Sequence, residues 1–301
     1  MAKGIRLLLF TLPLLAAAVW GTTYFPTSVD GTDSDDIELI SLPPLPDWAR
    51  KPLPDFSRYT DTTERKAAFF SYLYPRIVLA NARVLIQRKH LLTLADKTPL
   101  SKQDRDWLGQ QSERLKVEAP MGSEEMFDML ARRLDVIPPS LVLAQAANES
   151  AWGTSRFARS GNNLFGQWCF SKGCGLVPRG RVDGASHEVA SFDSPYQSIY
   201  SYIQNLNRHR TYQPLRNTRE QVREKGGRAT GHTLAQGLIG YSERGVDYVE
   251  EIRSMIRFNN LSYYDRQYRK RVGDELHAPT LLDLSTAAEA FLSSSKTPPE
   301  G

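Results

Sequence analysis

A carboxylate at the end of an apolar segment is the first feature of this sequence that could do chemistry. Glu149 directly follows an Ala-rich run in AQAANES, residues 144–150. Burying an ionised carboxylate costs free energy, so a packed helix gains little from such a residue. Burial also raises the pKa of a carboxyl group and so keeps a proton available for donation. We therefore expect Glu149 to be a general acid. The alternative is an ordinary acid that has reached the helix end and water.

A second carboxylate is the next requirement if the chemistry is hydrolysis of a sugar acetal. Glycosidases generally use one carboxyl group to protonate the leaving oxygen and another to activate water or stabilise the cation. The Gly- and Asn-rich segment 160–191 and the residues just after it offer Asp183, Glu188 and Asp193. Glu188 stands in the alternating run SHEVASF, which is typical of a short strand. We predict Glu188 as the second acid, with a solvated surface position as the alternative for each of the three.

Helical patterning surrounds these acids and must position them. Apolar residues recur at helical spacing from Thr62 onward, with Pro75 as an expected kink or break. The segment from Leu141 to Ala147 is apolar almost all round, which indicates a buried helix that Gly153 would end. Further helices are predicted over Ser101–Leu115, over Ser123–Leu134, from Pro195 onward, and over 233–238 and 245–258.

Changes in composition divide the chain into segments. With 301 residues and a hydrophobic share of 41%, the chain can build a real core and is not a disordered protein. The net charge of +4 suits a polyanionic partner, although a solvated basic face is the simpler interpretation. We predict a signal peptide or N-terminal anchor over 1–25, a Pro-rich linker over 26–57, a helical N-terminal extension over 58–120, the catalytic domain over 121–265 and a disordered tail over 274–301.

The N-terminus has the layout of an export signal. Lys3 and Arg6 precede an apolar stretch over 7–20, and small polar residues follow. An uncleaved membrane anchor is the alternative, because the apolar stretch could continue to Phe25 and reach a borderline spanning length. Either way the protein is predicted to be exported, and we expect it in the periplasm, released or anchored in the inner membrane.

The two cysteines, Cys169 and Cys174, lie close together in CFSKGC. In an oxidising compartment such a pair predicts a short disulfide that closes a loop. A metal site is the rival interpretation, but one C-x4-C pair with no histidine at helical spacing nearby makes a poor zinc site. We expect no metal and no cofactor, since the five histidines are scattered.

Four ordered segments carry a resemblance to a known family. NESAWGTSRFA, GNNLFGQW, SFDSPYQSIYSYIQNL and GYSERGVDYVEEIRSMI together resemble the N-acetylglucosaminidase family of peptidoglycan hydrolases, with flagellar rod-associated and autolysin-type enzymes as relatives. Within that family the segments look most similar to the bacterial Bax-type proteins. The resemblance covers about residues 120–262 and depends on the combination, because any one segment alone is a weak signal.

The resemblance implies a fold and a set of site residues. The implied fold is mostly α with a small β-hairpin lobe (α+β, lysozyme-like), in which a helical lobe holds the acid and the smaller lobe closes a saccharide groove. Glu149 matches the family's catalytic acid, and Tyr241 matches a tyrosine near the sugar site. Asn163, Leu164, Phe165 and Gly166 match the motif of the cleft floor. Trp168 and Tyr196 are candidates for sugar stacking, with a place in the core as the alternative for such aromatic residues.

We therefore expect an exported peptidoglycan hydrolase that cleaves the β-1,4 bond after N-acetylglucosamine. Its partner would be the glycan strands of the wall, and nucleic acid is not expected. Two alternatives stay open. One is a lytic transglycosylase, in which a single acid can suffice. The other is a catalytically inactive wall-binding protein that keeps the fold.

Overall fold

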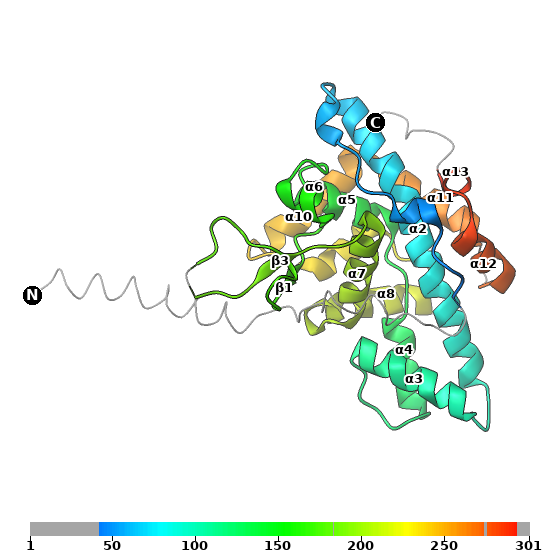
Figure 1. The fold of residues 1–301 in the computed structure, drawn as a ribbon. Helices are drawn as coiled ribbons and strands as arrows, with labels where there is room; N and C mark the ends of the chain where they lie inside the picture. The colour runs from blue at the N-terminus through cyan, green and yellow to red at the C-terminus, as the bar shows by residue number, and fades with distance from the viewer. Residues whose placement is uncertain (1–41, 183, 274–275, 294–301) are drawn as a thin grey trace, which may run out of the picture.

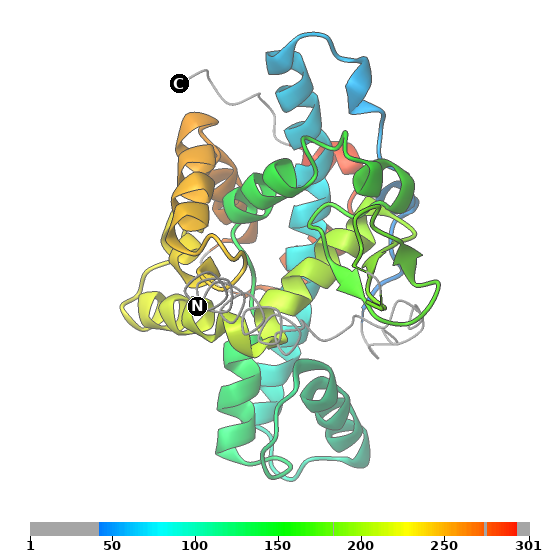
Figure 2. The same cartoon turned by 90° about the vertical axis from the view of Figure 1, so that its left-hand side faces the viewer.

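The computed structural model describes residues 42–182, 184–273 and 276–293. The predicted signal or anchor, most of the predicted linker and the candidate acid Asp183 lie outside these ranges. Figure 1 shows one long helix, α2, crossing the molecule, with α3 and α4 near one end and α12 and α13 along its side. The small β-lobe lies with α6 on another side of the helical body, as the turned view in Figure 2 also shows.

Helix α2 (Thr62–Ala95) is the central element of the core. It begins at Asp61, whose side chain accepts a hydrogen bond from the Glu64 amide at 2.8 Å. Its middle is buried on nearly every side, and the buried polar residues Arg76 and Asn81 donate hydrogen bonds to the carbonyls of Trp48 and Ile137. The helix continues through Pro75, so the predicted break is wrong. Proline removes one backbone hydrogen bond, and burial of the surrounding apolar side chains outweighs that loss.

The next helices begin where their capping residues predict. Ser101 and Asp104 form a capping box at the start of α3 (Lys102–Leu115), and the Ser123 hydroxyl caps α4 (Glu124–Arg133). Helix α5 (Pro139–Glu149) has proline at its first position, where a missing N–H costs nothing. The helical elements that follow up to residue 272 are α6 (Arg156–Gly161), α7 (Pro195–Arg208), η3 (Arg210–Tyr212), α8 (Gln213–Glu224), α9 (Gly231–Leu234), η4 (Ala235–Leu238), α10 (Val246–Phe258) and α11 (Ser262–Val272).

The β-lobe is a three-stranded antiparallel sheet. Strand β3 (Glu188–Ala190) lies in the centre, between β1 (Trp168–Cys169) and β2 (Gly175–Leu176). Cys169 pairs with Glu188, and Leu176 pairs with Val189. The predicted fold class, mostly helical with a small β-lobe, is confirmed, and the lobe has three short strands where a hairpin was expected.

Two segments that were predicted to be a linker and a disordered tail pack on α2 in the parts that the structure describes. The first contains η1 (Asp47–Arg50) and η2 (Phe56–Arg58), with Ala49 and Phe56 buried. The second forms α12 (Ala278–Thr286) and α13 (Glu289–Leu292), with Leu281 and Leu292 buried. A periodic apolar pattern is not required in these segments, because they bury only a few apolar side chains against α2.

Contacts between these two segments and α2 hold them together. The Trp48 indole donates to the Ala287 carbonyl at 2.9 Å. The buried guanidinium of Arg76 on α2 donates to the Trp48 carbonyl and pairs with Glu289 at 2.7 Å. The buried residues of the predicted N-terminal extension therefore belong to the same hydrophobic core as those of the predicted catalytic domain. Across the described ranges, none of the helices has the length and apolar character needed to span a membrane.

Candidate active site

Glu149 is the last residue of α5, and both ends of that helix are fixed. At its N-terminus, the buried carboxylate of Asp265 accepts hydrogen bonds from the amide and the hydroxyl of Ser140 at 2.8 and 2.7 Å. Along its length, the residues from Pro139 to Ala147 are buried. The helix thus carries Glu149 from the core to its partly exposed C-terminal end. The position itself disfavours a carboxylate, because the C-terminus of a helix carries partial negative charge.

The turn after Glu149 has an unusual backbone. Ala151, Trp152 and Gly153 all have positive φ angles, of 49°, 58° and 76°. Residues other than glycine seldom adopt this conformation, and consecutive ones are rarer still. Ser150 supports the turn, because its hydroxyl donates to the Ala146 carbonyl and accepts from the Gly153 amide at 2.8 Å. Such strained backbone persists where the surroundings over-determine it, which is typical of functional sites.

Residues of the N-terminal region hold this turn in place. The Trp152 ring contacts the rings of Phe69 and Phe70 edge-on, with centroids 5.8 and 5.3 Å apart. A Cβ atom at Gly153 would lie 2.6 Å from the Phe56 ring, so glycine is required there for space as well as for φ. Residues 56–70 therefore help to build the turn after Glu149, a contact that the sequence did not predict.

A chain of hydrogen bonds leads from the core to the Glu149 carboxyl group. The Tyr202 hydroxyl donates to Gln145 Oε1, and Gln145 Nε2 donates to the Tyr248 hydroxyl at 2.8 Å. Tyr248 in turn donates to Glu149 Oε1 at 2.6 Å. Because Gln145 and both tyrosines are buried, packing and hydrogen bonds together fix the orientation of the Glu149 side chain.

Burial is the main influence on the Glu149 proton. It raises the pKa of Glu149 above its ordinary value, while the hydrogen bond from Tyr248 acts in the opposite direction. Glu251 raises this pKa further and Arg244 lowers it, and those two groups are themselves paired at 2.6 Å. Burial and the neighbouring Glu149 also raise the pKa of Tyr248, which therefore stays a neutral donor. The site holds a proton on Glu149 more tightly than water would.

Stacked aromatic rings form the surroundings of this carboxyl group. Tyr241 stacks on Tyr248 with ring centroids 5.3 Å apart and planes 6° apart, and Phe165 stacks on Tyr202 at 4.0 Å. The two stacks are joined, because the Tyr241 hydroxyl donates to the Phe165 carbonyl at 2.9 Å. The structure thus brings the predicted Phe165 and Tyr241 into the network that also orients Glu149.

Asn163 and Gly166, also predicted to line the site, shape the loop that carries Phe165. The buried Asn163 amide donates to the carbonyls of Gln167 and Ala190 at 2.9 and 2.8 Å, and its oxygen accepts from the amide of Phe165 at 3.2 Å. Gly166 has a φ angle of 63°, which favours glycine. Both residues therefore act on the site through the backbone of this loop.

The two predicted stacking residues differ in exposure. Trp168 on β1 is 39% exposed and stacks on the His187 ring at 4.3 Å, so one ring face lies on the surface of the β-lobe. Tyr196 is 7% exposed and lies in the main core, beside Tyr200. The prediction for Tyr196 therefore finds no support in the structure. Tyr196 lies in the first turn of α7, and α7 packs against α2.

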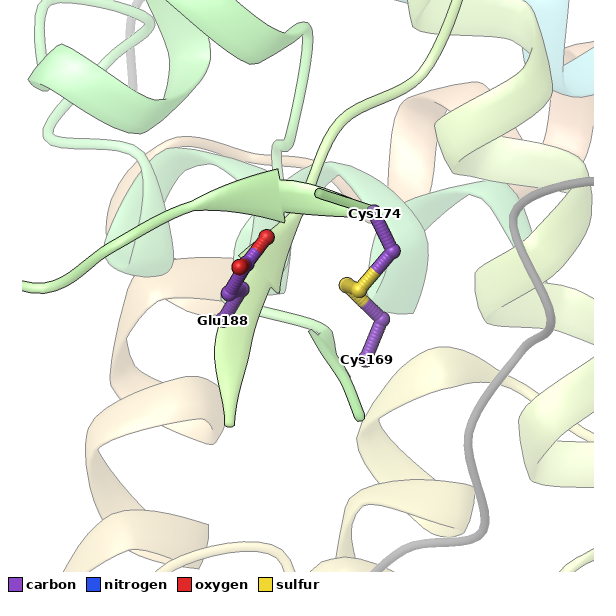
Figure 3. Close-up of side chains that lie close together, drawn as sticks. All are labelled: Cys169, Cys174 and Glu188. Carbon is purple, nitrogen blue, oxygen red and sulfur yellow. A yellow bond between two sulfur atoms is a disulfide. The ribbon is translucent and has the colours of Figure 1, made fainter. Parts of the chain in front are cut away.

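Glu188, the predicted second carboxylate, lies inside the β-lobe on strand β3. Figure 3 shows its side chain beside the Cys169–Cys174 bridge. One carboxylate oxygen accepts from the Gly173 amide at 3.0 Å and the other from the Gly175 amide at 2.8 Å. These two hydrogen bonds hold the pKa of Glu188 below its ordinary value. Both oxygens of the carboxylate are thus engaged in holding the β1–β2 loop, and its contacts give no support to a role beside Glu149.

The predicted disulfide is present, with the Cα atoms of Cys169 and Cys174 6.2 Å apart. The two sulfur atoms and the Glu188 carboxylate lie within 4.8 Å of one another, a grouping that reduced thiols could use to bind a metal ion. Sulfur atoms joined in a disulfide are not thiolate ligands, so this cluster is a structural staple.

Sequence reasoning missed the partners of Glu149. Gln145 could have been found, because it is a polar residue in an otherwise apolar helix, four positions before Glu149 and so on the same face. Tyr202 gave no comparable signal, and Tyr248 was identified only as part of the closing segment GYSERGVDYVEEIRSMI, without a contact to Glu149. They lie 57 residues after Gln145 and 99 residues after Glu149, so only the packing of α7 and α10 on α5 brings them together.

Comparisons with known proteins identify relatives of this chain. Residues 124–261 match the family model Glucosaminidase, described as mannosyl-glycoprotein endo-beta-N-acetylglucosaminidase. Protein bax of Escherichia coli (strain K12) is 35% identical to the chain over 208 residues, which are 69% of this chain and 74% of that protein. No solved structure matches the chain significantly. The matched region runs from α4 to the start of α11 and includes α5, the β-lobe and α10.

Proposed function

The chain belongs to the glucosaminidase family, in its Bax-type branch, and from this premise we propose that it is an exported hydrolase of peptidoglycan that cleaves the β-1,4 bond after N-acetylglucosamine. Family membership supports a glycosidase acting on peptidoglycan-type glycan. The observation that carries the finer proposal is the state of Glu149, a partly buried carboxyl group with a raised pKa, held at one oxygen by Tyr248.

Glu149 is proposed to act as the general acid. With Tyr248 bound to Oε1, the proton belongs on Oε2, which can face the glycosidic oxygen of a bound strand. As the bond between the anomeric carbon and that oxygen breaks, the proton moves to the leaving sugar and Glu149 becomes a carboxylate. The Tyr248 hydrogen bond strengthens as this charge develops, which lowers the energy of the transition state.

The group that assists at the anomeric carbon is proposed to be the 2-acetamido group of the substrate. Glu188 is committed to the amides of Gly173 and Gly175, so its contacts do not free it to activate water. Substrate assistance is an established exception to the two-carboxylate scheme. The acetamido oxygen would bond to the anomeric carbon as the leaving sugar departs, and water, deprotonated by the Glu149 carboxylate, would then open that ring.

The engagement of Glu188 also favours a second candidate, a lytic transglycosylase. That reaction needs one acid, takes up no water and leaves a ring-closed muramic end. The two candidates make different products from the same strand, so product analysis separates them.

The disulfide and the N-terminal sequence support the proposed export. Disulfides persist in oxidising compartments, and the Cys169–Cys174 bridge is such a bond. Residues 1–25 have the charged and apolar regions of a secretory signal. Cell fractionation of a host that expresses the full chain tests this proposal, and recovery of the protein in the cytoplasm would contradict it.

Mass spectrometry of muropeptides released from purified sacculi tests the reaction. We expect products that end in reducing N-acetylglucosamine with the wild-type chain, and none with Glu149→Gln. Glu125→Gln, which changes an exposed acid on α4, is the matched control and should digest normally. Anhydro-muramic ends would establish the transglycosylase instead. Intact sacculi with bound, folded wild-type protein would leave a wall-binding function.

A further inference from the structure

A cavity of about 380 Å³ lies at the opposite end of α5 from Glu149. Its walls come from α8, from residues 226–229 after α8, from α11 and from Pro138 and Pro139 at the start of α5. At 1.5 Å per helical residue, about 15 Å separate that start from Glu149. The volume is within the range of small-molecule sites, and the proposed glycosidase reaction makes no use of it.

Positive charge predominates around this cavity. Four arginines line it, with Asp265 as the one acidic residue among the lining residues described: Arg219, Arg223, Arg228 and Arg269. Just behind the wall, the buried carboxylate of Asp135 is shared by three guanidinium groups. Arg223 lies 2.5 Å from it, Arg219 3.4 Å and Arg88 3.9 Å. One carboxylate cannot neutralise three cations, so the described residues around the cavity carry a surplus of positive charge.

The guanidinium group of Arg269 on α11 has N–H donors that a ligand could accept from. Its side chain makes no hydrogen bond or ion pair with the part of the chain that the structure describes, and it influences Asp265 only through its charge. A guanidinium group carries five N–H donors in a planar fork that matches a carboxylate.

The Tyr268 hydroxyl is a second, independent indication of a ligand. Tyr268 lines the cavity, is only 6% exposed, and its oxygen has no hydrogen-bond partner among the described residues. A buried hydroxyl without a partner costs free energy, so such groups usually have an acceptor. Burial also raises the pKa of Tyr268, which keeps the group a donor.

We propose that this cavity binds a small organic carboxylate with a short apolar body, such as the C-terminus of a short peptide, through Arg269 and the Tyr268 hydroxyl. The apolar part of the wall, formed by Val136, Val272 and Leu276 among others, accommodates the body of the ligand. A carboxylate offers two oxygens in one plane, which match the planar fork of N–H donors on the Arg269 guanidinium.

Calorimetric titration of the full chain with N-acetyl-D-alanyl-D-alanine tests the proposal, and the C-terminal amide of the same dipeptide is the matched ligand. We expect saturable binding of the acid and none of the amide. Arg269→Gln should weaken binding about tenfold or more, and Tyr268→Phe severalfold, since hydrogen bonds to charged groups are the strong ones. Arg266→Gln, an exposed arginine on the same helix that does not line the cavity, should bind normally.

Three results would overturn the proposal. They are no binding of the acid at millimolar concentration, equal binding of acid and amide, or normal binding by both Arg269→Gln and Tyr268→Phe at an unchanged melting temperature. Tighter binding of inorganic phosphate than of the dipeptide would replace the carboxylate by a phosphate.

The carboxylate could come from the stem peptides of the wall or from a free small molecule. Sedimentation with intact sacculi, using Glu149→Gln with and without Arg269→Gln, separates these sources. Loss of sedimentation on the second substitution identifies the wall, and an unchanged result identifies a free ligand. Only the sedimentation experiment rests on the proposed function. The titration measures binding without turnover, so a failure of the proposed function would leave the test of the carboxylate site intact.

Discussion

The helical region and the β-lobe each hold a glutamate in place, and the two environments shift the pKa of that glutamate in opposite directions. Glu149 lies at a helix C-terminus, is partly buried and accepts one good hydrogen bond, from the neutral phenol of Tyr248. Glu188 lies in a sheet and accepts two hydrogen bonds from the backbone amides of Gly173 and Gly175. The pKa of Glu149 is raised and that of Glu188 is lowered.

The difference shows how a fold assigns roles to identical side chains. Amide donors stabilise the ionised form, so Glu188 stays ionised to a lower pH than an ordinary glutamate and is suited to holding a loop. Burial and the helix end disfavour the ionised form, so Glu149 keeps a proton that it can release. The first arrangement builds structure, and the second is suited to proton transfer.

The largest expected effect comes from removing the Glu149 proton. We predict that Glu149→Gln lowers kcat by about 10²–10⁴-fold, the usual contribution of a general acid. The melting temperature at pH 7 should not fall. Because the folded-state pKa of Glu149 is raised, this group favours the folded state at low pH, and that contribution is lost as the pH rises through the folded pKa. Turnover of sacculi and thermal denaturation measure the two effects. Normal digestion of sacculi by Glu149→Gln would show that Glu149 is not the general acid.

Glu149 is also the part of the site that the sequence predicted best. The order of motifs and the apolar run before it locate the acid at the end of a buried helix, which α5 confirms. The alternation around Glu188 predicted a strand, and β3 begins at that residue. Local pattern thus predicted the helix that ends at Glu149, the strand that begins at Glu188 and the capped starts of α3 and α4.

What the sequence did not predict depends on contacts between distant segments. The partner of Glu149 comes from α10, and the turn after it is packed by Phe56, Phe69 and Phe70 from a region that was taken to be a linker and an extension. The amides that hold Glu188 belong to a loop whose course is set by a disulfide and by strand pairing. Helices α12 and α13 have too few apolar residues to show a period, and they fold on α2.

The second prediction concerns the hydrogen bond that sets Glu149 apart. Tyr248→Phe removes the donor that stabilises the carboxylate, so the pKa of Glu149 should rise further. A general acid is active while protonated, so the alkaline limb of the pH–rate profile should move to higher pH. The maximal rate should fall about tenfold, because the developing carboxylate loses a strong hydrogen bond.

A profile of kcat/KM against pH for the wild type and Tyr248→Phe measures both changes. Tyr241→Phe is the matched control. Its hydroxyl donates to the Phe165 carbonyl rather than to Glu149, so the alkaline limb should stay in place. A shift to lower pH in Tyr248→Phe would mean that the hydrogen bond stabilises the protonated acid, and the assignment of the proton to Oε2 would fail.

The smallest effect on activity is expected from Glu188→Gln, and this variant tests the comparison most directly. An amide can accept from only one of the two glycine N–H groups and presents N–H to the other, so the β1–β2 loop should loosen and the melting temperature should fall. Because the folded-state pKa of Glu188 is lowered, its stabilising contribution is present above the ordinary glutamate pKa and is lost as the pH falls through the folded value. The difference in melting temperature should therefore be large at pH 7 and shrink in acid.

The turnover of sacculi by Glu188→Gln should fall only severalfold, because the loosened loop makes the β-lobe more mobile. Asp193→Asn, which changes an exposed acid just after β3, should alter neither quantity. If Glu188→Gln instead abolished turnover as fully as Glu149→Gln while the lobe stayed intact, Glu188 would be the second catalytic carboxylate, and its two amide bonds would serve to hold that carboxylate in its ionised form.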